Sequence, residues 1–159
     1  LYTLRFTPPL TCASDFQVDV EDKVDAGANG EVVRVTSGLM NFAPDDNELA
    51  AAVAHELAHN LLHHRTKLAG RRKSGSIRKT EIEADRLSVW LLANAGYDLE
   101  AAMAFWERYG RKYDPLLSDG THPGWKKRIA SMREEMASMK ASGKPAGSLE
   151  PPLLVSGAQ

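Results

Sequence analysis

The first 38 residues place apolar side chains in short alternating or aromatic runs, a pattern typical of β-strands. Two such runs are Tyr2–Phe6 and Phe16–Val20. The pair Asn29-Gly30 favours a tight hairpin turn, which would join a strand around Val24–Ala28 to a strand over Glu31–Thr36. The amino-terminal quarter of the chain is therefore predicted to form a small antiparallel sheet.

The apolar spacing then changes to that of a helix. Leucine or valine recurs every fourth residue from Leu49 to Leu61, which would line one helix face. Asp45, with Glu48 three residues later, has the spacing of a capping box. The pattern predicts a helix at about 46–65.

Further helices are predicted after a loop over residues 66–77. They are expected at about 79–95 (ending at Gly96), at about 99–111 (capped by Asp98) and from Pro123 onward. The sequence thus favours an α+β fold, with a small sheet packed on a mainly helical body. We expect one domain over residues 1–140 and a Pro/Gly-rich tail over 141–159, which packs on the surface, pairs with a sheet edge or occupies a cleft.

Composition removes several functional classes. The net charge of −1 gives no general attraction to nucleic acid or anionic lipid, and Cys12 alone forms no intrachain disulfide. No apolar run has the length of a membrane span. Because the chain begins at Leu1, we expect it to be a processed or excised piece. Seven basic residues lie between Arg65 and Lys79; they predict a solvated linker or, alternatively, a basic rim beside a cleft.

The motif that carries chemistry is His55-Glu56-Leu57-Ala58-His59. Residues four apart share a helix face, so His55 and His59 can bind one metal ion together. Glu56 lies one residue round from that face, where its carboxylate could reach a water molecule on the metal without being a ligand. A catalytic zinc needs a third protein ligand and one open position. His63 and His64 are expected to be surface or packing residues.

The second predicted helix offers the third ligand. Glu81 shares a face with the small residues Ala84 and Ser88, which would let that face approach the first helix closely. Glu83 points away and fits a capping box with Thr80, so Glu81 is the better candidate. Asp85, one turn further, could accept a hydrogen bond from a ligand imidazole and fix its tautomer.

The HELAH run and the later run Glu81–Asp85 resemble the metallopeptidase family that contains the CAAX prenyl protease and the heat-shock membrane protease. These enzymes are gluzincins, and the resemblance implies that Glu81 is the third zinc ligand. It covers about residues 24–130, including a match of His64 to a further family histidine and of Thr121-His122-Pro123 with Arg128-Ile129 to the downstream pattern. Only 21 residues separate His59 from Glu81, so the chain resembles the members without transmembrane insertions.

The predicted function is zinc-dependent endopeptidase activity on polypeptides, with one Zn²⁺ per chain held by His55, His59 and Glu81. Glu56 would act as the general base. His122 has three competing interpretations: it donates to the oxyanion, it binds zinc in a resting state, or it caps a helix. Tyr97 and Tyr109 are weaker candidates for that donor.

The predicted strand near Asp25, Ala26, Gly27 and Ala28 is expected to bind substrate as an added strand. The alternative function is a latent or non-catalytic, protein-binding or chaperone-like module of the same fold, with an unidentified regulatory partner. The resemblance to often exported bacterial proteins is the only basis for expecting a periplasmic location.

Overall fold

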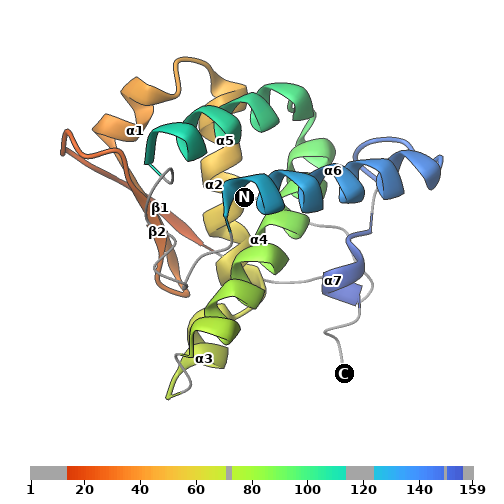
Figure 1. The fold of residues 1–159 in the computed structure, drawn as a ribbon, viewed down its shortest axis with the longest axis horizontal. Coiled ribbons are helices and arrows are strands. Elements are labelled where there is room, and N and C mark those ends of the chain that lie inside the picture. The colour runs from red at the N-terminus through yellow and green to blue at the C-terminus, as the bar shows by residue number, and fades with distance from the viewer. Residues whose placement is uncertain (1–13, 71–72, 114–123, 149, 156–159) are drawn as a thin grey trace.

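The computed structural model describes residues 14–70, 73–113, 124–148 and 150–155. Figure 1 shows a small sheet on one side of a body of crossing helices. The predicted strand Tyr2–Phe6 lies outside the described residues. The described elements are β1 (Asp15–Asp19), β2 (Ala26–Ala28), β3 (Val32–Thr36), α1 (Ser37–Phe42), α2 (Asp46–Leu61), α3 (His64–Leu68), α4 (Ser74–Ala95), α5 (Leu99–Tyr113), α6 (Trp125–Ala141) and α7 (Pro152–Val155).

The sheet is mixed, with strand order β1-β3-β2. The hairpin between β2 and β3 is antiparallel as predicted, with Gly27 opposite Arg34. The expectation of a wholly antiparallel sheet is wrong, because β1 pairs with β3 in parallel, with Phe16 opposite Val33. The chain reverses direction between β1 and β2 and again between β2 and β3. β1 and β3 therefore run in the same direction and pair in parallel. The α+β class itself is confirmed.

The core of the helical body is the contact between α2 and α4, which cross at the centre of Figure 1. Both helices bury small side chains, among them Ala51 and Ala58 on α2 and Ala84 and Ser88 on α4, all almost fully buried. Short side chains let two helix backbones approach closely. The expectation that Glu81 lies on a face made for close approach is therefore met by the packing of α4.

Three predicted helix boundaries are wrong. The helix expected from Pro123 begins at Trp125, after the N-cap Gly124. The first helix ends at Leu61 and the chain restarts as α3 at His64, because His63 adopts a left-handed backbone conformation with φ 54°. The helix expected at residue 79 already begins at Ser74. Thr80 is therefore inside α4, where its hydroxyl donates to the carbonyl of Ile77, and the proposed capping box with Glu83 does not exist.

Other predicted boundaries are confirmed. The Asp45 side chain accepts a hydrogen bond from the backbone N–H of Glu48, which caps α2. The Glu48 carboxylate, however, does not complete a capping box; it accepts hydrogen bonds from Arg108 on α5 and so ties α2 to α5. Gly96 ends α4, and Asp98 accepts from the first backbone N–H groups of α5.

Helix α6 lies across α4, and a buried carboxylate joins the two. Glu135 accepts hydrogen bonds from Arg86 and from the indole N–H of Trp90, both on α4. The tail contributes Pro151 and Leu154 to the buried interior, while Gly147 donates to Asn94 near the end of α4. Residues 150–155 are not among those that line the cavity described below, which favours the surface-packing interpretation of the tail.

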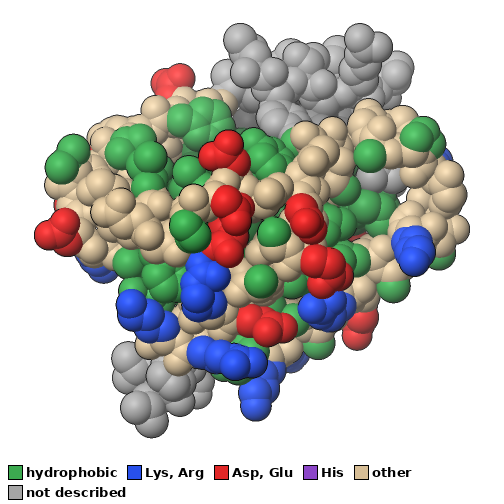
Figure 2. Space-filling model, turned by 90° about the horizontal axis from the view of Figure 1, so that it is seen from above, with side chains coloured by type: hydrophobic (Ala, Val, Ile, Leu, Met, Phe, Trp, Pro, Cys, Tyr) green, Lys and Arg blue, Asp and Glu red, His purple; other side chains and the backbone are tan. Residues whose placement is uncertain are grey.

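The surface in Figure 2 mixes acidic, basic and apolar side chains, and no histidine is visible among the described residues on that face. No helix in the described ranges is both long enough and apolar enough to span a membrane.

Candidate metal centre

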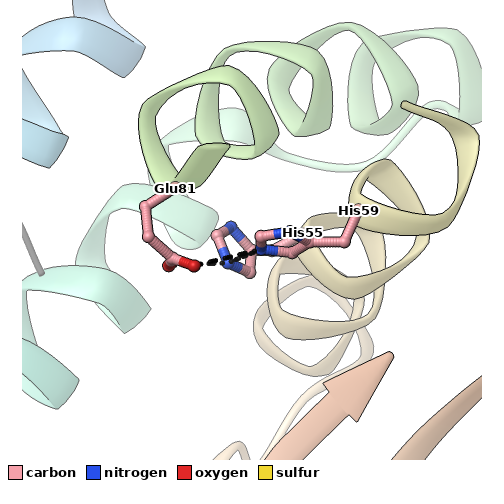
Figure 3. A group of neighbouring side chains, drawn as sticks. All are labelled: His55, His59 and Glu81. Carbon is pink, nitrogen blue, oxygen red and sulfur yellow. Dashed lines mark hydrogen bonds and ion pairs between the residues drawn. The ribbon is translucent and has the colours of Figure 1, made fainter. Parts of the chain in front are cut away.

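Three of the predicted site residues converge between α2 and α4. Figure 3 shows His55 and His59 pointing from α2 toward Glu81 on α4. The two Nε2 atoms are 3.1 Å apart. The Glu81 carboxylate lies 3.5 Å from Nε2 of His55 and 3.4 Å from Nε2 of His59. The spacing of four residues on α2 and the small-residue packing of α4 together produce this cluster.

The geometry of the cluster suits a single zinc ion. Zinc bonds to imidazole nitrogen and carboxylate oxygen are about 2.0–2.2 Å long, so tetrahedral ligand atoms lie roughly 3.3 Å from one another. The three separations in the cluster are close to that value. Two imidazoles and one carboxylate are also the donor set of several catalytic zinc sites, which leave one position for water. The residues therefore fit the metal that the motif implies.

His55 is held from behind by a buried carboxylate. Its Nδ1 atom lies 3.0 Å from Oδ1 of Asp85, close enough for a charged contact between the imidazole and the carboxylate. Asp85 is fully buried and accepts two hydrogen bonds of 2.8 Å from Nε and Nη2 of Arg128 on α6. The guanidinium also lies over the ring of Trp106, with its carbon 4.8 Å from the ring centre.

These charges shift the pKa values of the buried groups. Burial lowers the pKa of His55, but the carboxylates of Asp85 and Glu81 outweigh burial and raise it to about 10. For the carboxyl group of Asp85, burial acts in the opposite direction and raises the pKa. The charge of Arg128 and its hydrogen bonds outweigh burial, so the pKa of Asp85 is lowered. Metal binding requires the neutral ring, so a metal ion and a proton compete for Nε2 of His55.

His59 is held differently, by a second histidine. Its Nδ1 atom lies 2.9 Å from Nδ1 of His64, which is 1% exposed, and Nε2 of His64 lies 3.1 Å from the carboxylate of Glu83. Burial and the neighbouring His59 lower the pKa of His64 to about 3. The expectation that His64 is a surface or packing residue misses these contacts. The expectation that Glu83 caps the start of a helix is wrong, because Glu83 lies inside α4 and contacts His64. His63, by contrast, is exposed.

A cavity of about 260 Å³ adjoins the cluster and is lined by His55, Glu56 and Glu81. Asp25 and Ala26 form one border, at the start of β2. Because β2 pairs only with β3 among the described strands, its outer edge is available to a further strand. The rest of the wall is mainly apolar and aromatic: Leu39, Phe105, Trp106, Tyr109, Tyr113, Trp125 and Met132.

The candidates for an oxyanion donor are placed unequally. Tyr109 lines the cavity, and its burial raises the pKa of the phenol, which keeps the hydroxyl protonated. Tyr97 lines a different pocket, with Leu49 and Leu92. His122 lies outside the described residues.

Comparison with known proteins agrees with this geometry. The sequence model of Peptidase family M48 matches residues 13–74 and 71–136, which is most of the chain. The chain belongs to this family. It is 31% identical over 128 residues to the mitochondrial metalloendopeptidase OMA1 of Arabidopsis thaliana and 30% identical over 138 residues to that of Schizosaccharomyces pombe. It is also 31% identical over 150 residues to a Vibrio cholerae protein named as a beta-barrel assembly-enhancing protease.

These matches cover 62%, 66% and 66% of the chain but only 26%, 41% and 31% of the three relatives. The chain therefore spans less than half the length of each of these relatives. Family membership confirms the predicted resemblance and places the chain among metallopeptidases.

Some contacts of the site had no clear signal in the sequence. On one continuous helix His59 and His64 would be about 140° apart, so their contact requires the break at His63. Arg128 reaches Asp85 across 43 residues. In the sequence, Arg128 stands out only as part of the family pattern.

Proposed function

We propose that the protein is a zinc-dependent endopeptidase that hydrolyses peptide bonds in polypeptides. The observation that supports this most is the convergence of His55, His59 and Glu81 within 4.8 Å of one another beside a cavity that Glu56 also lines. When bound there, zinc supplies a Lewis acid that polarises the peptide carbonyl and makes water a nucleophile near neutral pH. A structural zinc site would need neither the neighbouring Glu56 nor the cavity.

In this mechanism each residue of the site has one task. His55, His59 and Glu81 hold the metal, and Asp85 orients His55. Glu56 takes a proton from the attacking water and passes it to the leaving amine. His122 donates to the developing oxyanion, with Tyr109 as the alternative donor on the described cavity wall. The substrate backbone pairs with the outer edge of β2 at Asp25–Ala28.

The test combines metal analysis with cleavage of an unstructured protein substrate. Wild type should bind about one zinc per chain and cleave. Glu56→Gln should keep zinc and lose cleavage, whereas Glu81→Ala should lose both. Glu134→Gln, which changes an exposed glutamate on α6, is the matched control and should keep both zinc and cleavage. Cleavage that survives in Glu56→Gln would overturn the mechanism.

The aromatic part of the cavity supports a preference for a large apolar substrate side chain next to the bond that is cleaved. Gly110 on α5 lets Trp125 sit against this wall, because a Cβ atom at Gly110 would lie 2.4 Å from Cβ of Trp125. Gly110→Ala should therefore displace Trp125 and lower cleavage beside Phe or Leu about tenfold or more, relative to cleavage beside Ala. Gly124→Ala, where a Cβ atom meets nothing within 4 Å, is the control.

Two alternatives are separated by the same assays. A latent enzyme would bind zinc and cleave only after a partner or His122 variant opens the site. A non-catalytic module that binds polypeptides would keep substrate binding in wild type without cleavage under any condition. The similarity to the Vibrio cholerae relative is consistent with the proposed periplasmic location, which cell fractionation would test.

A further inference from the structure

We propose that His64 and Glu83 act as a positioning pair that fixes the tautomer and orientation of His59. The inference rests on the proposed function, because it takes His59 to be a metal ligand. Neither residue touches the position between the three ligand atoms. Both act through His59.

The distances trace one path away from the metal cluster. Nε2 of His59 faces Glu81, and Nδ1 of the same ring lies 2.9 Å from Nδ1 of His64. Nε2 of His64 then lies 3.1 Å from Oε2 of Glu83. The other carboxylate oxygen of Glu83 lies 3.7 Å from Nζ of Lys79, one turn earlier on α4.

Only one arrangement of protons satisfies this path. A nitrogen that binds a metal carries no proton, so the proton of neutral His59 resides on Nδ1. Nδ1 of His64 must then accept, which places the proton of neutral His64 on Nε2. That N–H in turn donates to the Glu83 carboxylate. The path therefore ends on a negative charge, and it makes His59 a better electron donor to a metal.

The backbone is shaped to place His64 there. Helix α2 stops at Leu61, and His63 takes a left-handed conformation that a residue other than glycine rarely adopts. This turn returns the chain so that His64, the first residue of α3, is buried against His59. The exposed His63 side chain makes no capping hydrogen bond to α3. What the turn at His63 achieves is the placement of His64 against His59.

Zinc affinity, measured by competition with a chromophoric chelator, tests the pair. His64→Leu should weaken zinc binding about 10–100-fold. His64→Asn should retain most of the affinity, because its Oδ1 can accept from His59 near the position of Nδ1. Glu83→Ala should weaken binding about tenfold. His63→Asn is the matched control: asparagine tolerates the left-handed conformation, and the affinity should stay unchanged.

A spectroscopic measurement separates positioning from simple space filling. In the zinc-loaded protein, ¹⁵N NMR of the imidazoles should show the His59 proton on Nδ1 and the His64 proton on Nε2. The unfolding midpoint of each metal-free variant establishes that it is folded. A proton on Nδ1 of His64, wild-type affinity in His64→Leu, or His64→Asn as weak as His64→Leu would each overturn the pair. Wild type that binds no zinc would overturn the proposed function as well.

Discussion

The two histidines of α2 that face Glu81 are supported by different chemistry, although they are one helical turn apart. Behind His55 stands Asp85, a fully buried carboxylate neutralised by Arg128 from another helix. Behind His59 stands a neutral histidine, and its carboxylate Glu83 is 22% exposed. The first support is therefore part of the core of the fold. The second is local to α3 and the first half of α4, near the protein surface.

The difference teaches that a residue that orients a ligand side chain can also stabilise the fold, as Asp85 does, or can orient the ligand with little effect on stability, as we expect for Glu83. A buried charge cannot lose its partner without a large cost, since water does not replace the partner. A partly exposed carboxylate can be rehydrated. We therefore expect changes behind His55 to affect both folding and metal binding, and changes behind His59 to affect mainly metal binding.

The largest effect is expected for Asp85→Ala. It leaves the guanidinium of Arg128, whose side chain is only 15% exposed, without its carboxylate, which should lower the free energy of unfolding by about 3 kcal/mol. Urea unfolding of the metal-free protein measures this. A loss below about 1 kcal/mol would show that water reaches Arg128 and that this support is no more structural than the other.

A double-mutant cycle sharpens the same point. Arg128→Met alone should also cost about 3 kcal/mol, because it leaves Asp85 charged and buried. Combined with Asp85→Asn it should cost less than the sum of the two single changes, by about 0.5–3 kcal/mol. The variant that carries both Arg128→Met and Asp85→Asn should bind zinc more weakly than wild type, since His55 has lost its carboxylate. Additive losses of stability would argue against a coupled pair.

Asn60 provides a buried polar group beside His59 that is not connected to the metal path. Its side chain accepts a 2.7 Å hydrogen bond from the backbone N–H of Gly30 and holds the β2–β3 hairpin on α2. Asn60→Ala should lower stability by about 1–3 kcal/mol through the unsatisfied hairpin group. Zinc affinity, compared with that of His64→Leu, should change little. A large loss of affinity would mean that any damage near His59 disturbs the metal.

The smallest effect on stability is expected for Glu83→Ala. The exposure of this carboxylate limits the expected loss in the metal-free protein to about 1 kcal/mol. Thermal unfolding with and without zinc should show that the variant loses more in the zinc-loaded state than in the metal-free state. Equal losses in both states would place Glu83 with the structural ion pairs instead of with the metal support.

Local patterns accounted for most of the fold. The Asn29-Gly30 turn, the Asp45 cap, the end of α4 at Gly96 and the start of α5 after Asp98 follow from preferences that act within a few residues. The errors concern the orientation of β1 and the start of α4. β1 pairs in parallel with β3, a strand more than ten residues away in the chain, and α4 begins at Ser74, five residues earlier than the pattern predicts.

The sequence by itself predicted the trio of His55, His59 and Glu81, because helical periodicity places the two histidines on one face of α2 and Glu81 on the small-residue face of α4. It also predicted that Asp85, one turn beyond Glu81, lies beside one of the two imidazoles, and the structure shows that this imidazole is His55. Only the tertiary structure decided that the chain breaks at His63, that His64 and Glu83 stand behind His59, and that Arg128 neutralises Asp85. Periodicity reports the direction of a side chain on its own helix. Which group meets that side chain depends on how separate helices pack, and no local pattern carries that information.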